Sequence, residues 1–123
     1  MFEMVGKKIL IVDDDFMSAK LMKMLIGNSD NIETASNGRE GLRKINKQRF
    51  DLIISDVHMP VMTGIEMYVE AKKSDPGIKD RMLFLSASTD PEMIGFFKEQ
   101  NLAYMVKPSP VTQIRDMLRK IIG

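Results

Sequence analysis

Short apolar runs alternate along the chain with longer segments in which apolar residues recur at helical spacing. Four of the runs are about four residues long and bounded by polar residues, which is typical of strands buried on both faces of a parallel sheet. These runs are Ile9-Leu10-Ile11-Val12, Leu52-Ile53-Ile54, Met82-Leu83-Phe84-Leu85 and Ala103-Tyr104-Met105-Val106. Ile32 to Ala35 is a weaker candidate with polar residues in it, which suits an edge strand.

The segments between these runs predict helices, because their apolar residues repeat with the period of one helix face. The repeating residues are Met17, Leu21, Met24 and Leu25; Leu42 and Ile45; Ile65 and Val69; Met93, Ile94 and Phe97; and Val111, Ile114, Leu118, Ile121 and Ile122. Two helix starts carry cap signals, namely Ser109 before Pro110, and either Thr89 with Glu92 or Asp90 before Pro91. Asn37-Gly38 and Ser74-Asp75-Pro76-Gly77 are typical of loops.

Alternation of strands and helices implies right-handed crossovers and a parallel sheet with helices on both sides. The predicted fold class is therefore α/β, a three-layer doubly wound sandwich with five strands. A length of 123 residues fits one domain over 1–123, and 44% of the residues are hydrophobic, enough for one packed core.

Composition narrows the function classes. Lys and Arg number 18 against 17 Asp and Glu, so a net charge of +1 gives no basic field for nucleic acid. The chain has no cysteine, which excludes disulfides and thiolate chemistry. Met1 to Lys8 lacks the apolar stretch of a secretory signal, and no run approaches the roughly 20 apolar residues that span a bilayer. A cytoplasmic domain with no membrane contact is expected, with the 12 methionines as core filler.

Every predicted central strand is followed by a polar group. Asp13 and Asp14 follow the run that begins at Ile9, and Asp56 follows the run that begins at Leu52. Ser86 follows the run that begins at Met82, and Lys107 the run that begins at Ala103. The carboxyl ends of parallel strands meet at one edge of the sheet, where ligands of such folds bind. These residues are therefore expected to form one site.

The charges of this site indicate its chemistry. Two carboxylates about 4 Å apart repel each other by roughly 4 kcal/mol at an effective dielectric constant near 20, so the cluster needs a cation. Oxygen ligands and the lack of sulfur favour Mg²⁺, which is typically held by carboxylates together with phosphate oxygens and water. Lys107 supplies a positive charge for a phosphoryl group and Ser86 a hydrogen-bond donor. Metal-assisted phosphoryl transfer is the chemistry that this set predicts.

Four motifs also carry a resemblance. They are Val12-Asp13-Asp14-Asp15, Asp56 with Met59-Pro60 and Gly64, Ser86-Ala87, and Lys107-Pro108. In this order they resemble the receiver domain of bacterial two-component response regulators, over essentially the whole chain. The resemblance implies a flavodoxin-like (βα)5 fold with strand order 2-1-3-4-5 and a cis Lys107-Pro108 bond.

The resemblance also implies roles for individual residues. Asp56 would be the phosphoacceptor, receiving a phosphoryl group from a phosphohistidine of a sensor histidine kinase. Mg²⁺ would be held by Asp14, by Asp13 directly or through water, by Asp56 and by the backbone carbonyl of His58. Lys107 would pair with the phosphoryl oxygens. Ser86 would move towards the phosphoryl group and Tyr104 would turn inward behind it.

On this interpretation the domain is not an enzyme but a regulatory phosphoacceptor that switches between two arrangements. The readout face would be the fourth helix, fifth strand and fifth helix. Partners would be a kinase or phosphotransfer protein on one side, and a downstream target or an effector domain beyond this chain on the other. A phosphorylation-dependent dimer is left open, as is the choice between a stand-alone receiver and part of a longer regulator or hybrid kinase.

Three alternatives remain open. Asp13-Asp14-Asp15 after a strand also resembles the haloacid-dehalogenase phosphatases, in which Asp13 would be the nucleophile, although Met17 stands where that family wants Thr. A receiver fold that no longer accepts phosphate would be a passive binding module. A flavin carrier shares the topology, but no Ser/Thr-rich phosphate loop follows the first strand.

Three residues near the motifs have simpler interpretations. Asp15, where receivers often have Glu, is favoured as a helix N-cap over a metal ligand. His58 is favoured as a side chain at the pocket mouth that modulates access of water. Ser109, where receivers often have Phe, changes the start of the last helix and so bears on the partner surface.

Overall fold

The computed structural model describes residues 6–27 and 31–122, which form a five-stranded parallel sheet in the order β2-β1-β3-β4-β5. The strands are β1 (Ile9–Val12), β2 (Ile32–Ala35), β3 (Leu52–Asp56), β4 (Met82–Ser86) and β5 (Ala103–Val106). The predicted fold class, strand positions and strand order are all confirmed, including an edge position for β2. The N-terminal segment Met1–Val5, which bears on the absence of a signal sequence, lies outside the described residues.

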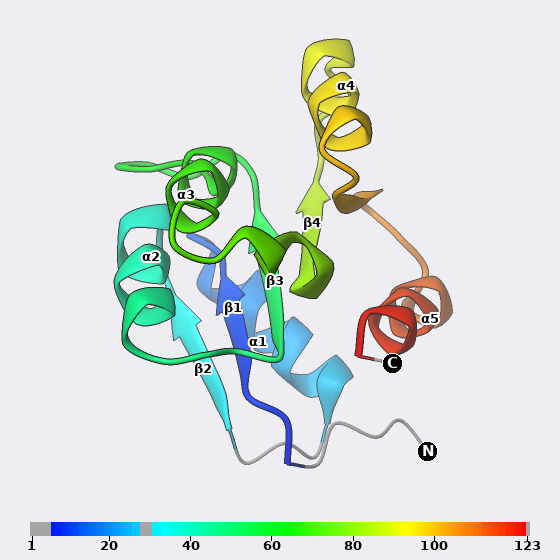
Figure 1. The fold of residues 1–123 in the computed structure, drawn as a ribbon. Coiled ribbons are helices and arrows are strands. Elements are labelled where there is room, and N and C mark those ends of the chain that lie inside the picture. The colour runs from blue at the N-terminus through cyan, green and yellow to red at the C-terminus, as the bar shows by residue number, and fades with distance from the viewer. Residues whose placement is uncertain (1–5, 28–30, 123) are drawn as a thin grey trace.

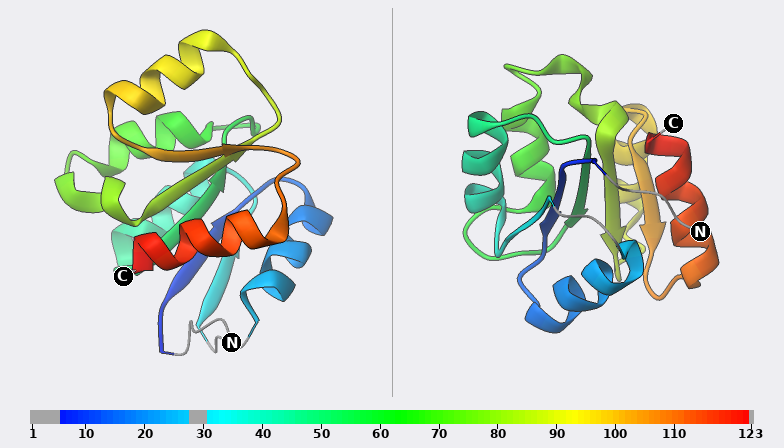
Figure 2. Two further views of the ribbon diagram at one scale, coloured as in Figure 1. Left: turned by 90° about the vertical axis from the view of Figure 1, so that its right-hand side faces the viewer. Right: turned by 90° about the horizontal axis from the view of Figure 1, so that it is seen from below.

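Helices cover both faces of the sheet (Figures 1 and 2). They are α1 (Phe16–Ile26), α2 (Gly38–Lys47), α3 (Gly64–Ala71), α4 (Pro91–Glu99) and α5 (Val111–Ile122), with a short 3-10 helix, η1 (Pro76–Arg81), before β4. Helices α1 and α5 pack on one face, and α2, α3 and α4 on the other. Among the described residues, none of the helices has the length and apolar character needed to cross a bilayer.

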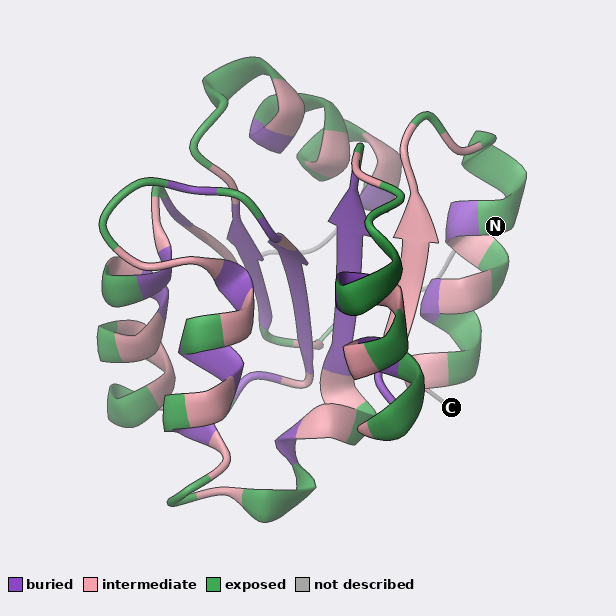
Figure 3. Ribbon diagram, turned by 90° about the horizontal axis from the view of Figure 1, so that it is seen from above, coloured by how far each residue is buried: buried purple, intermediate pink, exposed green. Residues whose placement is uncertain are grey.

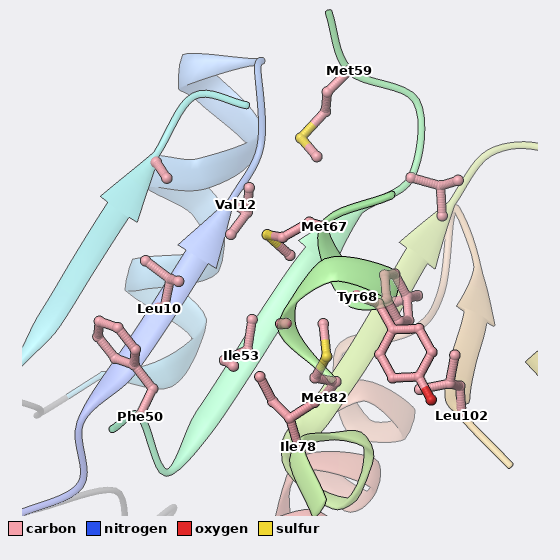
Figure 4. Packing of buried hydrophobic residues seen from close by; sticks show 14 of the residues in the cluster. Leu10, Val12, Phe50, Ile53, Met59, Met67, Tyr68, Ile78, Met82 and Leu102 are labelled. Atoms are coloured by element: carbon pink, nitrogen blue, oxygen red, sulfur yellow. The ribbon is translucent and has the colours of Figure 1, made fainter. Parts of the chain in front are cut away.

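Two apolar clusters, one on each face, hold the layers together. Successive strand residues point to opposite faces, so Leu10 and Ile53 join the cluster under α2, α3 and α4, while Ile11 and Ile54 join the cluster under α1 and α5. Figure 4 shows part of the first cluster. Strand β4 is buried along its whole length and the edge strand β5 is only half-buried, as Figure 3 shows. The central strands therefore hold their last residues rigidly at one edge.

Hydrogen bonds at the helix starts decide one local prediction that was left open and correct another. The Asp90 side chain accepts from the Glu92 N–H, so Asp90 and not Thr89 caps α4. Asn37 lies before α2, as its predicted loop position requires, and its side chain accepts from the Glu40 N–H and caps the helix, whereas Gly38 is already the first residue of α2. Ser109 does not cap α5, since its hydroxyl donates to the Val106 carbonyl at 2.6 Å and the helix begins at Val111.

Two further differences concern larger segments. The predicted loop at Ser74-Asp75-Pro76-Gly77 leads into η1. Pro76 is the first residue of this helix, and its missing N–H costs nothing there because a backbone N–H at that position has no acceptor within the helix. In α1, the apolar spacing correctly predicts a helix, but it does not mark the buried face. Met17, Leu21 and Met24 are exposed, and Ala19 and Ile26 are buried instead. Met17 and Met24 are therefore not core filler.

Candidate functional site

The residues expected to meet do meet, because the register of the sheet aligns the strand ends. Val12 pairs with Ser55, Asp56 with Leu85, and Ser86 with Val106. The residues that follow β1 and β5 therefore lie at the same edge as the last residues of β3 and β4. In addition, the Lys107 N–H donates to the Ser86 carbonyl at 2.7 Å.

Lys107 places one positive charge against the acidic cluster. Its Nζ lies 3.5 Å from Oδ2 of Asp56 and 3.7 Å from Oδ2 of Asp13. Both carboxylates are largely buried, at 10% and 17% side-chain exposure for Asp13 and Asp56, so their attraction to the ammonium is screened less than at the surface. One amine thus bridges two acids that come from different strands.

Three carboxylates converge on one point. Asp13, Asp14 and Asp56 each offer an oxygen, and these oxygens all lie within 4.8 Å of one another. Burial raises the pKa of Asp13, which the Asp15 N–H and Lys107 only partly offset, and the Asp56 and Asp14 charges raise it further. A cation placed among these oxygens would remove that repulsion. Hard oxygen donors at this spacing suit Mg²⁺, whose ligands lie about 2.1 Å from the ion.

Local packing fixes the position of Asp56. Its Oδ1 accepts the Val57 N–H at 2.7 Å, which leaves Oδ2 towards Lys107. The first residue of α3, Gly64, lies so close that a Cβ there would meet the Asp56 carbonyl oxygen at 2.2 Å. Only glycine allows this approach, and the capping box of Thr63 with Glu66 starts α3 at that point.

The side chain of Ser86 contacts α4. Its buried hydroxyl accepts the Ser88 N–H at 3.1 Å and lies 3.7 Å from the sulfur of Met93. Tyr104, the next candidate along the chain, is half-buried and stacks on Phe97 of α4, with ring centroids 5.1 Å apart. Both candidates for the switch therefore contact the same helix.

Comparison with known proteins agrees with this arrangement. A family model for the response regulator receiver domain matches residues 9–119. The chain belongs to this family. It is 33% identical to sporulation initiation phosphotransferase F of Bacillus subtilis, over 97% of this chain and 96% of that protein. Chemotaxis protein CheY4 of Vibrio cholerae matches in structure with a TM-score of 0.80 at 34% identity, covering 94% of this chain and 98% of that one.

The receiver domain is the phosphoacceptor domain of two-component response regulators and has a regulatory, signalling role. A CheY-like receiver domain protein of Methanospirillum hungatei has a TM-score of 0.83 at 29% identity, covering 94% of this chain and 93% of that one. Other curated relatives are longer: this chain spans 47% of a response regulator receiver protein of Anaeromyxobacter. The family match leaves the phosphatase and flavin-carrier alternatives without support.

Local geometry describes three further features that the sequence singled out. Asp15 is the N-cap of α1, accepting from the Met17 N–H at 3.0 Å and the Ser18 hydroxyl at 3.1 Å, and these bonds lower its pKa. The Lys107-Pro108 bond is cis. His58 is exposed, two residues beyond Asp56.

Sequence reasoning missed two parts of the site. Met93 was identified only as an apolar residue of a helix, yet its sulfur contacts the Ser86 hydroxyl. Gly64 was noted as part of a motif, without the steric reason that excludes any other residue. The motif that begins at Asp56 already contained Gly64 and so could have indicated its importance. Nothing in the spacing of Ser86 and Met93 predicts their contact.

Proposed function

We propose that Asp56 is the phosphoacceptor of this receiver domain, which extends over 1–123. A carboxylate oxygen of Asp56 attacks the phosphorus of a phosphohistidine, a P–O bond forms, and the P–N bond breaks as the imidazole leaves. The observation that carries this proposal is the position of the Asp56 carboxylate, which is held at the end of a central strand 3.5 Å from the Lys107 ammonium. Phosphoryl transfer depends mainly on such positioning and charge neutralisation.

The metal ligands in this proposal are Asp13, Asp14, Asp56 and the backbone carbonyl of His58. When bound there, Mg²⁺ neutralises carboxylate charge and attracts phosphoryl oxygens. Lys107 then pairs with the phosphoryl oxygens that face it. The acceptor is a side chain of the protein itself, so the domain assists its own phosphorylation and is not an enzyme with a separate substrate.

Ser86 and Tyr104 form the switch in this proposal. A phosphoryl group on Asp56 adds about two negative charges and strong acceptor oxygens. The Ser86 hydroxyl donates to one of them and so gives up its contact with Met93. Tyr104 moves with α4, because its ring is stacked on Phe97. The readout face is then α4, β5 and α5, which a downstream target, an effector domain or a second copy of the domain recognises.

The phosphodonor is a sensor histidine kinase or phosphotransfer protein in the cytoplasm. An exposed apolar patch on α1 supports a protein donor, since such patches mark interaction sites. We call Phe16, Met17, Leu21 and Met24 the α1 patch; their exposed fractions run from 57% to 77%. It begins directly after Asp13, Asp14 and Asp15, so a protein seated on it lies beside the acidic cluster. No direct contact with nucleic acid or membrane is proposed.

Incubation with Mg²⁺ and acetyl phosphate, read by intact mass, tests this function. One phosphoryl group should add to the parent protein, and none to Asp56→Asn or to the parent protein in EDTA. As a matched control, Asp116→Asn removes an exposed acid from α5 and should be labelled normally. Full labelling of Asp56→Asn would place the nucleophile elsewhere.

A further inference from the structure

A groove of about 350 Å³ lies between α2 and the loop that joins β3 to α3. Figure 1 shows this loop extending over the upper end of α2. Arg39, Arg43 and Lys47 line one side of the groove, at successive four-residue intervals along α2. Val61, from the loop, lines it too. We call this feature the α2 groove.

Most of the charge in the α2 groove is unneutralised. Lys44 pairs with Glu33 at 3.5 Å and with Glu40 at 4.0 Å. Among the described residues, no ion pair involves Arg39, Arg43 or Lys47. Four cations and one acid line the groove, a local excess of +3 in a chain whose net charge is +1. An anionic occupant would complement it.

Val61 gives a second, independent indication of a binding surface. The Met62 N–H donates to the Pro60 carbonyl at 2.7 Å, which closes a three-residue turn around Val61 with φ at +70°. This is the rare, strained form of the γ-turn, and β-branched residues are true outliers at positive φ. The side chain is also 70% exposed, so it gains no burial that would offset the strain. Contact with a partner would bury it.

The α2 groove is joined to the phosphorylation site through one loop. The Gly38 N–H at the start of α2 donates to the Met62 carbonyl at 2.8 Å, and a Cβ at Gly38 would meet that oxygen at 2.6 Å. The loop that is fixed to α2 in this way begins directly after Asp56. A partner in the groove therefore contacts the segment that leads to the phosphoacceptor.

We propose that the α2 groove docks an acidic segment of a partner protein, with an apolar side chain against Val61. The basic row selects carboxylates, and the exposed valine adds an apolar anchor. Nucleic acid fits less well, because a chain with a net charge of +1 offers a phosphate backbone no extended basic face, and the exposed Val61 calls for an apolar partner. This site does not depend on Asp56 being the phosphoacceptor.

NMR titration of the isotope-labelled, unphosphorylated protein tests the proposal. The probe is a synthetic peptide of Glu-Glu-Leu repeats, with Glu-Glu-Ser repeats as the test of the apolar anchor. The first peptide should shift the signals of Arg39, Arg43, Lys47 and Val61 in a saturable way, and the second should bind about threefold more weakly or worse. Tighter binding of an oligothymidylate of equal length to the same residues would overturn the proposal in favour of a nucleic-acid surface.

Variants locate the binding energy. Arg39→Glu with Arg43→Glu should weaken the peptide about tenfold. Lys20→Glu with Lys23→Glu makes the same charge change on exposed residues of α1 and should have little effect. Equal losses in both double variants would mean non-specific attraction and would refute the site.

Val61→Asn tests the apolar anchor. The variant should raise the urea midpoint of unfolding, because Asn tolerates positive φ, and yet weaken binding of the peptide about threefold. Undiminished binding by this variant would remove the anchor from the proposal.

Discussion

The hydroxyl of Ser86 lies 3.7 Å from the sulfur of Met93, so the residue at the end of β4 is connected directly to α4. The contact is weak, because a thioether sulfur is a poor acceptor. A charged phosphoryl oxygen would be a much stronger acceptor for the same hydroxyl. Phosphorylation therefore has a short physical route to the helix that forms part of the proposed readout face.

Ser86→Ala tests this route. The variant should still take up a phosphoryl group, because Asp56, Asp13 and Lys107 are unchanged. Without the hydroxyl, the change in the Met93 methyl signal on phosphorylation should fall by roughly half or more, as measured by NMR. Ser74→Ala removes an exposed hydroxyl from the opposite end of the sheet and should leave that change intact. An undiminished Met93 response in Ser86→Ala would reject the route.

Lys107→Ala tests the balance of charge in the site. The ammonium lies within 4 Å of two acids, so its removal should tighten Mg²⁺ binding severalfold, measured by calorimetry. It should also slow phosphorylation by about tenfold or more, because the phosphoryl oxygens lose their positive partner. Lys120→Ala, at an exposed position on α5, serves as the control for loss of a lysine. Unchanged rates for Lys107→Ala would exclude the assigned role.

Gly64→Ala tests the packing that positions Asp56. A Cβ at this position would meet the Asp56 carbonyl oxygen at 2.2 Å, and backbone cannot move aside as a side chain can. Urea unfolding should show a loss of about 1–3 kcal/mol in the free energy of unfolding, together with slower phosphorylation. Gly95→Ala is the matched control, since no atom lies within 4 Å of a Cβ there. It should raise the free energy of unfolding by up to about 1 kcal/mol, because alanine favours the interior of α4.

Leu21→Ser separates docking from chemistry. The side chain belongs to the exposed α1 patch and carries no charge, so the ion pairs of Lys107 with Asp13 and Asp56 stay in place. Transfer from the phosphohistidine domain of a sensor kinase should slow by about tenfold, while phosphorylation by acetyl phosphate stays unchanged. Val111→Ser makes a similar change at an exposed apolar residue of α5 and should affect neither rate. Equal transfer rates for Leu21→Ser and the parent protein would show that the donor binds elsewhere.

The strands and the site were predictable for the same reason. Ile53 and Leu83 face opposite sides of the sheet and both are fully buried. Because the central strands are buried on both faces, their runs are continuously apolar, and Asp56 and Ser86 mark where the runs stop. The start of α5 was less predictable, because Ser109 has a competing acceptor in the Val106 carbonyl.

Surface features were the least predictable from the sequence. Periodicity reveals that α1 has an apolar face, but it does not reveal that Leu21 points outward while Ala19 faces the sheet. The strained turn at Val61 and its place beside Arg43 depend on how the loop after β3 meets α2. Such contacts between distant segments leave no local pattern.

The central claim is that Asp56 carries the phosphoryl group. Treatment of the phosphorylated protein with borohydride reduces an acyl phosphate to an alcohol and so converts the modified aspartate into homoserine. Tandem mass spectrometry of the digested protein then reports which aspartate was modified. We expect homoserine at position 56 alone, and homoserine at position 13 or 14 in its place would contradict the account.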